Sequence, residues 1–490
     1  MVYNIVEDIF LGADIMKISI GDIFRGKTVS LLGAGVSNLP LAAVAAESAE
    51  LLTVRDKKSR EELGSTAEQL EVLGAKLITG DSYLAGIDEE LVFRSPGIRP
   101  DLPELVEAVA NGSRLTSEME LFLSLEPCPI YAVTGSDGKT TTTTLTSLML
   151  EAALGREHVF LGGNIGEPLL HRYPGISEND AVAVELSSFQ LMTIDSPIAV
   201  AAITNITPNH LNWHTSMDEY IWAKKRILSK CGRAVLNYDN DITREIALEM
   251  QKNTDTPVTF FSLSPIPREL LRDIDSMVWL DGNGDIRTYF PDEGERRIMN
   301  RADIKLPGLH NTANYMTAVG ITHGIASAEM IRDIAHSFGG VEHRLEFVRE
   351  LDGVTYINGS IDSSPTRTAA ALSAINDRPV VLIAGGYDKN IPYEPLADAI
   401  FNSNVRALVL TGATAEKINA AVVSHPKYKD AVQEGFVIIK NPSFDEAVSD
   451  ARGIARSGDT VILSPASASF DAFPNFMERG RHFKKLVNEF

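Results

Sequence analysis

Cysteine is scarce in this sequence. Only Cys128 and Cys231 occur among 490 residues, and two cysteines can build neither a disulfide framework nor a cysteine-based zinc site. The first residues mix acidic with apolar side chains and include no basic segment, which argues against a signal peptide. The longest apolar run, residues 198–203, falls far short of the ~18 apolar residues of a membrane helix and is typical of a buried strand. We therefore expect a soluble, cytoplasmic protein without a membrane partner.

Positively charged residues are also fewer than negatively charged ones. The chain has 45 Lys and Arg against 66 Asp and Glu, a net charge of −21 with neutral His. Nucleic-acid-binding proteins usually present a basic face, so we expect no nucleic-acid partner. Anionic small ligands remain compatible with this balance, because a local pocket can be positive on an acidic protein.

What the sequence does have is an ordinary globular composition, with 44% hydrophobic and 23% charged residues. Its length suggests about three domains. Valine- and isoleucine-rich runs alternate with helical stretches in three blocks, which begin near residues 28, 129 and 343. This pattern predicts an α/β fold with parallel sheets, where ligands bind at the carboxyl ends of strands. The polar stretch 251–300 predicts surface hairpins outside the second block's core, with a turn at 281–284.

A glycine-rich loop is the strongest local motif. The strand-like IYAVT is followed by Gly135-Ser136-Asp137-Gly138-Lys139-Thr140 and then by a helical stretch. Glycines let backbone N–H groups surround a phosphate, the lysine contacts the β/γ-phosphates, and the threonine hydroxyl ligates Mg²⁺. The alternative is a turn with a chance Lys-Thr pair. The agreement of strand, loop, Lys-Thr and helix favours the phosphate loop, although its spacing is shorter than the general pattern.

A second glycine motif, Gly33-Ala34-Gly35, also follows a strand, and Asp56 ends the next strand. The third glycine of the dinucleotide fingerprint is missing, because Val36, Ser37 and Asn38 follow. Binding of NAD, binding of another nucleotide, and simple strand–helix packing are all open. The motif alone favours packing.

Three residues of the second block are candidates for phosphoryl chemistry. Glu185 closes an apolar run, where a carboxylate often binds Mg²⁺. His210 follows the next strand, with His214 as a competing candidate. Lys224 lies in an amphipathic helical stretch beside Lys225 and Arg226, and by itself it is most simply one of a solvated run of charges.

Taken together, several segments resemble the Mur ligases of peptidoglycan synthesis, in family order from residue 28 to the C-terminus. They are SPGI (95–98), EMELF (118–122), TGSDGKTT (134–141), GGNIG (162–166), ELSSFQL (185–191), NHL–AKKRI (209–227), LPGLHNTAN (306–314), HRLE (343–346), GGYDK (385–389) and SPASASFDAFPNFMERG (464–480). GGNIG, ELSSFQL and the C-terminal segment resemble the branch that adds D-glutamate. The D-N-P-R segment of the diamino-acid-adding branch is absent.

The resemblance implies three domains: an N-terminal Rossmann-like domain for the UDP substrate (1–116), a central P-loop ATPase-type domain (117–340) and a Rossmann-like C-terminal domain for the amino acid (341–490). It implies an ATP-dependent ligase that adds D-glutamate to UDP-N-acetylmuramoyl-L-alanine through an acyl phosphate, in cytoplasmic peptidoglycan precursor synthesis. The expected partners are these small-molecule substrates, and a monomer is expected. The rivals are another Mur-type ligase, a P-loop module that moves a partner, and an NAD-dependent oxidoreductase.

The resemblance also implies roles for single residues. The catalytic set is Lys139, Glu185, His210 and Lys224. ATP would be held by Gly135, Ser136, Asp137, Gly138, Lys139, Thr140, Thr141, Asn311, Asn314 and Arg344. Mg²⁺, with two ions expected, would be held by Thr140, Glu185, His210 and a carbamylated Lys224. The UDP substrate would contact Val36, Ser37, Asp56, Lys57, Gly97 and Asn164, and D-glutamate would contact Ser363, Lys389, Ser469, Phe470 and Phe476.

Two positions depart from the family's pattern. Gly359 stands where the family often has Asp, and Ile361 stands where some members have Lys. These changes alter the expected contacts of this loop, and Asp362 is the candidate to take over part of them. About 20 N-terminal residues lie outside the match, and a small surface addition is expected there.

Overall fold

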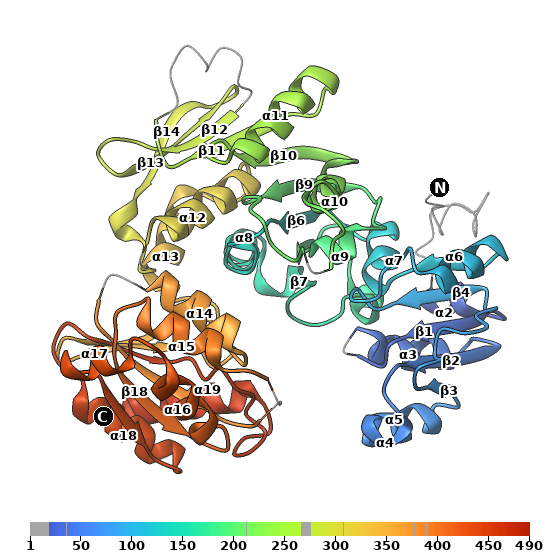
Figure 1. Ribbon diagram of the computed structural model, residues 1–490. Helices are drawn as coiled ribbons and strands as arrows, with labels where there is room; N and C mark the ends of the chain where they lie inside the picture. Colours follow the sequence, from blue (N-terminus) through green and yellow to red (C-terminus); the bar gives the residue numbers. More distant parts are fainter. Residues whose placement is uncertain are drawn as a thin grey trace. The chain divides into compact units, whose positions relative to one another are not determined.

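The computed structural model describes residues 19–35, 37–211, 213–265, 276–306, 308–375, 378–388 and 391–490. Most of the expected N-terminal addition lies outside these ranges, and so do two predicted site residues, Val36 and Lys389. The chain divides into two compact units, Met1–Ser337 and Phe338–Phe490 (Figure 1). Within the described ranges, no helix is long and apolar enough to cross a membrane.

The first unit begins with a five-stranded parallel sheet in the order β3-β2-β1-β4-β5. Its strands are β1 (Thr28–Leu32), β2 (Leu51–Asp56), β3 (Lys76–Thr79), β4 (Leu91–Arg94) and β5 (Arg114–Thr116). The surrounding helices are α2 (Ile20–Phe24), α3 (Asn38–Ala46), α4 (Arg60–Leu63), α5 (Ser65–Val72) and α6 (Pro103–Ala110). Helix α7 (Glu118–Ser124) then leads to the second sheet. Buried apolar side chains on both faces explain why these strands read as continuous hydrophobic runs.

The second sheet of this unit has nine strands in the order β14-β13-β12-β11-β10-β9-β6-β8-β7. Its parallel strands are β6 (Ile130–Thr134), β7 (Val159–Gly163), β8 (Ala181–Glu185), β9 (Ile198–Ile203), β10 (Cys231–Asn237), β11 (Val258–Ser262) and β12 (Ser276–Leu280). The helices are α8 (Lys139–Leu154), α9 (Ser188–Leu191), α10 (Met217–Lys225), α11 (Asp241–Asn253), α12 (Leu309–Ile321) and α13 (Ala328–Ser337). Strand β6 lies between β8 and β9, so the loop after it stands amid the carboxyl ends of its neighbours.

The stretch 251–300 was only partly predicted by its sequence. The turn at 281–284 is present, between β12 and the antiparallel strand β13 (Asp285–Phe290), and β14 (Gly294–Asn300) completes a hairpin. The expectation of surface hairpins apart from the core was wrong for the rest. Strands β11 and β12 continue the parallel sheet, and their side chains are buried. The polar residues before and after these two short apolar strands made the whole stretch resemble surface hairpins.

The second unit is a six-stranded sheet in the order β15-β16-β20-β17-β18-β19. Strand β15 (Glu346–Leu351) is antiparallel to β16 (Val354–Asn358), whereas β17 (Val380–Gly385), β18 (Val405–Thr411), β19 (Val437–Lys440) and β20 (Thr460–Leu463) are parallel. Its helices are α14 (Pro365–Ala374), α15 (Glu394–Phe401), α16 (Ala415–Ser424), α17 (Tyr428–Gln433), α18 (Phe444–Ile454) and α19 (Phe476–Glu489). Separate apolar clusters cover its two faces. The predicted α/β class with three sheets is confirmed.

Candidate active site

The glycine-rich loop joins β6 to the N-terminus of α8, as its sequence predicts. Gly138 caps the helix in the left-handed region (φ 79°), and Gly135 also has a positive φ of 149°. Lys139 begins the helix, and its Nζ donates to the Ser136 carbonyl at 2.8 Å. The helix N-terminus and the lysine therefore give this loop a positive character, which suits a phosphate.

Both loop glycines are also required by close neighbours. A Cβ on Gly135 would collide with the side chain of Thr204, which follows β9. A Cβ on Gly138 would collide with the side-chain amide of Asn314 on α12. The loop is thus held between the end of β9 and helix α12, and any other residue at these two positions would displace it.

Asn205 is a residue of this loop's surroundings that the sequence analysis missed. The backbone N–H of Ser136 donates to its carbonyl at 2.8 Å, and the N–H of Asp137 donates to its side-chain oxygen at 3.0 Å. Its position two residues after strand β9 was the available signal, since polar residues at carboxyl ends of parallel strands gather at one sheet edge.

A hydroxyl, a carboxylate and an amide meet at the end of β8. The Thr140 hydroxyl donates to one carboxylate oxygen of Glu185 at 2.7 Å, and the Asn164 side-chain amide donates to the other at 2.7 Å. Glu185 is buried, with 1% of its surface exposed. Oxygen donors of this kind are the ligands that Mg²⁺ prefers. The structure therefore brings together three residues that the sequence analysis assigned to the metal and the substrate.

Lys224 is buried, with 1% of its surface exposed. The prediction from the residues alone, that Lys224 belongs to a solvated run of charges, is therefore wrong. Helix α10 points it inward, where its Nζ donates to the Gly135 carbonyl at 2.6 Å and lies 4.7 Å from the Tyr220 ring centroid. Burial lowers the pKa of this ammonium well below its ordinary value, and the nearby charge of Lys139 lowers it further. This shift favours the neutral, nucleophilic form of the amine.

Tyr220 is a second residue that the sequence analysis missed. It stands one helical turn before Lys224 on α10, and its hydroxyl lies 2.9 Å from the Ser136 hydroxyl. Ser136 in turn donates to the Thr207 carbonyl at 2.9 Å. The i, i+4 spacing of an aromatic residue and a lysine was a signal of a shared face, but nothing in the sequence showed that this face was buried.

The two histidine candidates differ in burial and in hydrogen bonding. The His214 side chain is buried, and its two ring nitrogens lie 2.9 Å from Glu219 Oε1 and from Ser188 Oγ. Such a ring supports the structure. His210 is exposed, has a positive φ of 56°, and lies edge-on to Phe189 with 5.1 Å between ring centroids. Desolvation of the ring by its neighbours, and then the charges of Lys139 and Lys224, lower its pKa, which favours the neutral imidazole.

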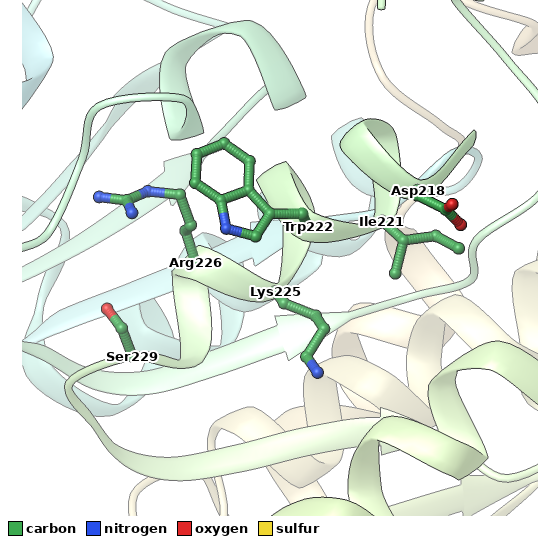
Figure 2. A pocket seen from close by; sticks show the side chains of 6 residues that line it. All are labelled: Asp218, Ile221, Trp222, Lys225, Arg226 and Ser229. Atoms are coloured by element: carbon green, nitrogen blue, oxygen red, sulfur yellow. The ribbon is translucent and has the colours of Figure 1, made fainter. Parts of the chain in front are cut away.

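The outer face of α10 carries no part of this constellation. Figure 2 shows the side chains that line a pocket there: Asp218, Ile221, Trp222, Lys225, Arg226 and Ser229. The volume of this pocket is about 450 Å³. The Arg226 guanidinium lies 5.2 Å from the Trp222 ring centroid, and its Nε donates to the Leu191 carbonyl at 2.9 Å. Lys225 pairs with Glu249 at 2.6 Å. Of the three adjacent cations, only Lys224 therefore turns toward the phosphate loop.

The other predicted nucleotide residues of the first unit lie close to the loop. Thr141 belongs to the first turn of α8, and Thr142 donates to the Asn314 side-chain oxygen at 3.3 Å. Asn314 donates to the Asn311 side-chain oxygen at 3.2 Å, so the two amides of α12 form a pair. Asn311 and Asn314 are thus placed beside the loop that precedes α8.

The first sheet carries the second glycine motif at the carboxyl end of β1. Gly33 has a φ of 92°, and a Cβ there would meet the Ser95 side chain. Asp56 accepts hydrogen bonds from the backbone N–H of Ala34 at 2.7 Å and of Lys58 at 2.8 Å. The bond from Ala34 holds the Gly33 loop to the end of β2, and the bond from Lys58 closes the turn that follows β2.

The remaining predicted residues of this region lie around the same edge. Ser37 immediately precedes α3, and Lys57 follows β2 with an exposed side chain. The Gly97 carbonyl accepts from the indole N–H of Trp213 at 3.0 Å. The Arg99 guanidinium also bonds the Trp213 carbonyl and Glu219, which ties the first sheet to the segment that carries His210.

In the second unit, the predicted amino-acid residues come from two neighbouring loops. Ser469 is buried after β20, and Phe470 is exposed. Phe476 begins α19, and its carbonyl accepts from the Ser360 hydroxyl at 2.8 Å, on the loop of Ser363. Arg344 is exposed between His343 and Leu345, which both have positive φ values of 66° and 46°.

Comparison with known proteins gives two family models that match this chain. The model described as Mur ligase middle domain matches residues 133–322, and the model described as Mur ligase, glutamate ligase domain matches residues 343–467. Among curated proteins, the UDP-N-acetylmuramoylalanine--D-glutamate ligase of Ruminiclostridium cellulolyticum is 45% identical over 95% of this chain and 97% of its own length. Its namesake in Clostridium novyi is 44% identical over 95% of this chain and 98% of its own length.

Solved structures agree at the level of the fold. UDP-N-acetylmuramate-alanine ligase from Thermotoga maritima aligns with a TM-score of 0.51 at 16% identity, over 94% of this chain and 99% of its own. A structure of UDP-N-acetylmuramoyl-L-alanyl-D-glutamate--2,6-diaminopimelate ligase also reaches 0.51 at 16% identity, over 83% and 94%. At such low identity these alignments show the fold alone. The curated relatives are far more similar in sequence and align over nearly the whole chain. The chain belongs to the Mur ligase family.

Proposed function

We propose that this chain is an ATP-dependent ligase that joins D-glutamate to UDP-N-acetylmuramoyl-L-alanine. Relatives of that name are similar to the chain over nearly its whole length. The structural observation that carries the ATP-driven part is the convergence of Lys139, Thr140, Glu185 and Lys224 at the carboxyl edge of one sheet. An NAD-dependent oxidoreductase would not need this constellation. A P-loop module that moves a partner would not need the C-terminal segment 464–480.

The reaction brings two anions together, the substrate carboxylate and ATP. This explains why positively charged and hydrogen-bond-donating residues are needed. A substrate carboxylate must attack the γ-phosphate of ATP, which forms an acyl phosphate and releases ADP. The amine of D-glutamate then attacks the acyl carbonyl, and the resulting tetrahedral intermediate expels phosphate to leave the amide. Such a transfer depends on charge neutralisation and in-line positioning. Lys139 and the N-terminus of α8 provide positive charge, and Asn311 and Asn314 provide amide donors on the nucleotide side.

The residues present also fit Mg²⁺. The Thr140 hydroxyl and the buried Glu185 carboxylate are hard oxygen donors, and they lie within hydrogen-bond distance of one another. We propose that these two residues hold one ion, and that His210 and a modified Lys224 contribute to a second. When bound, Mg²⁺ neutralises phosphate charge. Asn164 orients the Glu185 carboxylate through its other oxygen.

Lys224 fits carbamylation on chemical grounds. An ammonium at this place would repel a cation, whereas a carbamate offers oxygen atoms to it. A neutral amine is what reacts with carbon dioxide, and burial favours that form of Lys224. The short bond from Nζ to the Gly135 carbonyl holds the amine against the phosphate loop.

We also propose where the UDP substrate and the amino acid bind. We assign the UDP moiety to the carboxyl edge of the first sheet, where Gly33, Ser37, Asp56, Lys57 and Gly97 lie. We assign the amino acid to Ser363, Ser469, Phe470 and Phe476 of the second unit, together with Lys389, and the nucleotide also to Arg344. We further propose that the enzyme works as a monomer in the cytoplasm.

The test is a phosphate-release assay with UDP-N-acetylmuramoyl-L-alanine, ATP and a panel of amino acids, with product masses confirmed. We expect strong preference for D-glutamate over D-alanine and D-glutamine, because a site built for two carboxylates leaves polar groups unpaired with a ligand that lacks one of them. L-Glutamate should also be a poor substrate, because inversion at Cα cannot place the amine and both carboxylates together. Lys389→Ala should raise the apparent KM for D-glutamate far more than that for ATP. Equal turnover with L-alanine or a diamino acid would assign the chain to another branch of the family.

A further inference from the structure

The loop after β16 contains an acidic side chain in an unusual place. An ideal Cβ built on Gly359 would lie 2.7 Å from Asp362 Oδ2 and 2.8 Å from the Leu463 carbonyl oxygen. Real Cβ atoms essentially never approach so closely. The carboxylate of Asp362 therefore fills the space in which a side chain at position 359 would begin. Position 359 is also where this chain has Gly although the family often has Asp.

Asp362 is held in this space by its neighbours. Its backbone N–H donates to the Gly359 carbonyl at 2.9 Å, which closes a tight turn. The Ser464 hydroxyl, directly after β20, donates to Asp362 Oδ2 at 2.9 Å. The side chain is 8% exposed. A buried carboxylate is costly unless it is hydrogen-bonded or faces positive charge.

Positive charge is present around it. Arg344, Arg367 and Arg479 all interact electrostatically with Asp362. The buried Arg479 donates to the Ser360 carbonyl at 2.9 Å and to the Ala468 carbonyl at 2.9 Å. It thereby ties the loop of Asp362 to the residue that precedes Ser469. Asp362 thus stands among the cations that surround both amino-acid loops, and Asp471 also interacts with Arg479.

We propose that Asp362 is a positioning residue of the ligase reaction, supplying from position 362 the carboxylate that the family often supplies from position 359. It fixes the turn that precedes Ser363 and balances Arg344, so that both present their polar groups to the reactants. This inference rests on the proposed function, because Ser363 and Arg344 are assigned by it.

The experiment compares Asp362→Ala, Asp362→Asn, Gly359→Asp and the double variant Gly359→Asp/Asp362→Ala in the full-length enzyme. Asp362→Asn retains the size and a hydrogen-bond acceptor for Ser464 but removes the charge. Asp430→Ala, an exposed residue of α17, is the matched control. We expect both single changes at position 362 to lower kcat/KM for D-glutamate and ATP by about 30-fold or more. The KM for the UDP substrate should stay within about twofold, because its proposed site lies in the first unit.

The double variant is the second arm. It returns an acid to position 359 and removes the one at 362, but the added Cβ still lies 2.8 Å from the Leu463 carbonyl oxygen, so recovery over Asp362→Ala should be partial and should stay below wild-type activity. Gly359→Asp alone should be impaired, since two carboxylates would then share one space. Wild-type rates in Asp362→Asn would overturn the inference, and so would a double variant that melts at the same temperature as Asp362→Ala yet shows no recovery. A wild-type enzyme that releases no phosphate with D-glutamate would instead contradict the proposed function.

Discussion

At the scale of single residues, two lysines near the phosphate loop differ in burial and therefore in chemistry. Lys139 is partly exposed and donates to the Ser136 carbonyl, as a cation that meets an incoming phosphate would. Lys224 is buried, and its lowered pKa favours the neutral amine. The same residue type thus lies in two different environments, one partly exposed and one buried.

Replacing Lys139 tests the charge. We expect Lys139→Ala to lower the rate about a hundredfold or more, equivalent to ~3 kcal/mol of transition-state stabilisation, because a positive charge on the transferring phosphoryl group is lost. The fold should persist, since the side chain is partly exposed. Steady-state phosphate release together with a thermal melt measures both effects. Near-normal turnover would contradict the assignment of the phosphate loop.

Replacing Lys224 tests the modification. We expect Lys224→Ala to be inactive, and millimolar acetate or formate to restore part of the activity by supplying carboxylate oxygens in place of the carbamate. The adjacent Lys225→Ala is the control: its ion pair with Glu249 is at the surface, so its activity should be unchanged. Intact-mass measurement under native conditions should find a carbamate on Lys224. An active enzyme with unmodified Lys224 would refute this prediction.

At the scale of elements, helix α7 carries a buried acid. It connects the two sheets of the first unit, and Glu118 at its first position accepts from the backbone N–H of Leu170 at 2.7 Å. Burial raises the pKa of Glu118 to about 7. An acid whose pKa is raised by folding favours the folded state while it is protonated. That contribution is complete below the unfolded value of 4.5 and is lost as the pH rises through about 7.

Glu118→Gln should therefore change how stability depends on pH. The amide keeps an acceptor for Leu170 and cannot ionise, so the variant should be more stable than the wild type at pH 8, by about 1–3 kcal/mol. The difference should vanish near pH 4.5. Urea unfolding at several pH values, with fluorescence as the probe, measures it. A constant difference across this range would mean that Glu118 does not titrate as the fold implies.

The elements also show what sequence reasoning could reach. Loop Gly135–Thr140 and Glu185 were found from residue type and position alone, because glycine conformation and strand ends impose strong local rules. The burial of Lys224 was not visible from the sequence. The expectation of an amphipathic helix was wrong, because α10 has no strong apolar face that marks its orientation. Lys225 and the following Arg226 line the outer pocket instead. Asn205 and Tyr220 matter through contacts with residues 68 and 84 positions away, which no local pattern encodes.

At the scale of the whole molecule, the two compact units have cores of their own. Phe483 of α19 is fully buried in a cluster that consists only of second-unit residues. Leu145 of α8 is fully buried in the first unit. Units with separate cores can unfold as separate cooperative steps. Sequence blocks and family resemblance predicted three domains, and their exact limits stay a prediction.

Calorimetry of the full chain should therefore resolve two transitions. Phe483→Ala should lower one of them and Leu145→Ala the other, each by about 2–5 kcal/mol of unfolding free energy, because each leaves a cavity in a different core. The wild-type protein and Asp430→Ala are the controls. A single transition that shifts equally in both variants would show that the units unfold together.

The contact of Asn314 with the phosphate loop has a consequence for synthesis on the ribosome. Thr142 and Asn314 are hydrogen-bonded although 172 residues separate them. At the usual speed of translation, roughly 10 to 35 s pass between the emergence of the loop and that of α12. During this interval the first sheet can fold, because its strands are close together in the chain, whereas the loop still lacks the amide against which Gly138 packs. A nascent chain arrested before residue 309 should therefore bind ATP poorly, and this competence should appear only after α12 has left the exit tunnel.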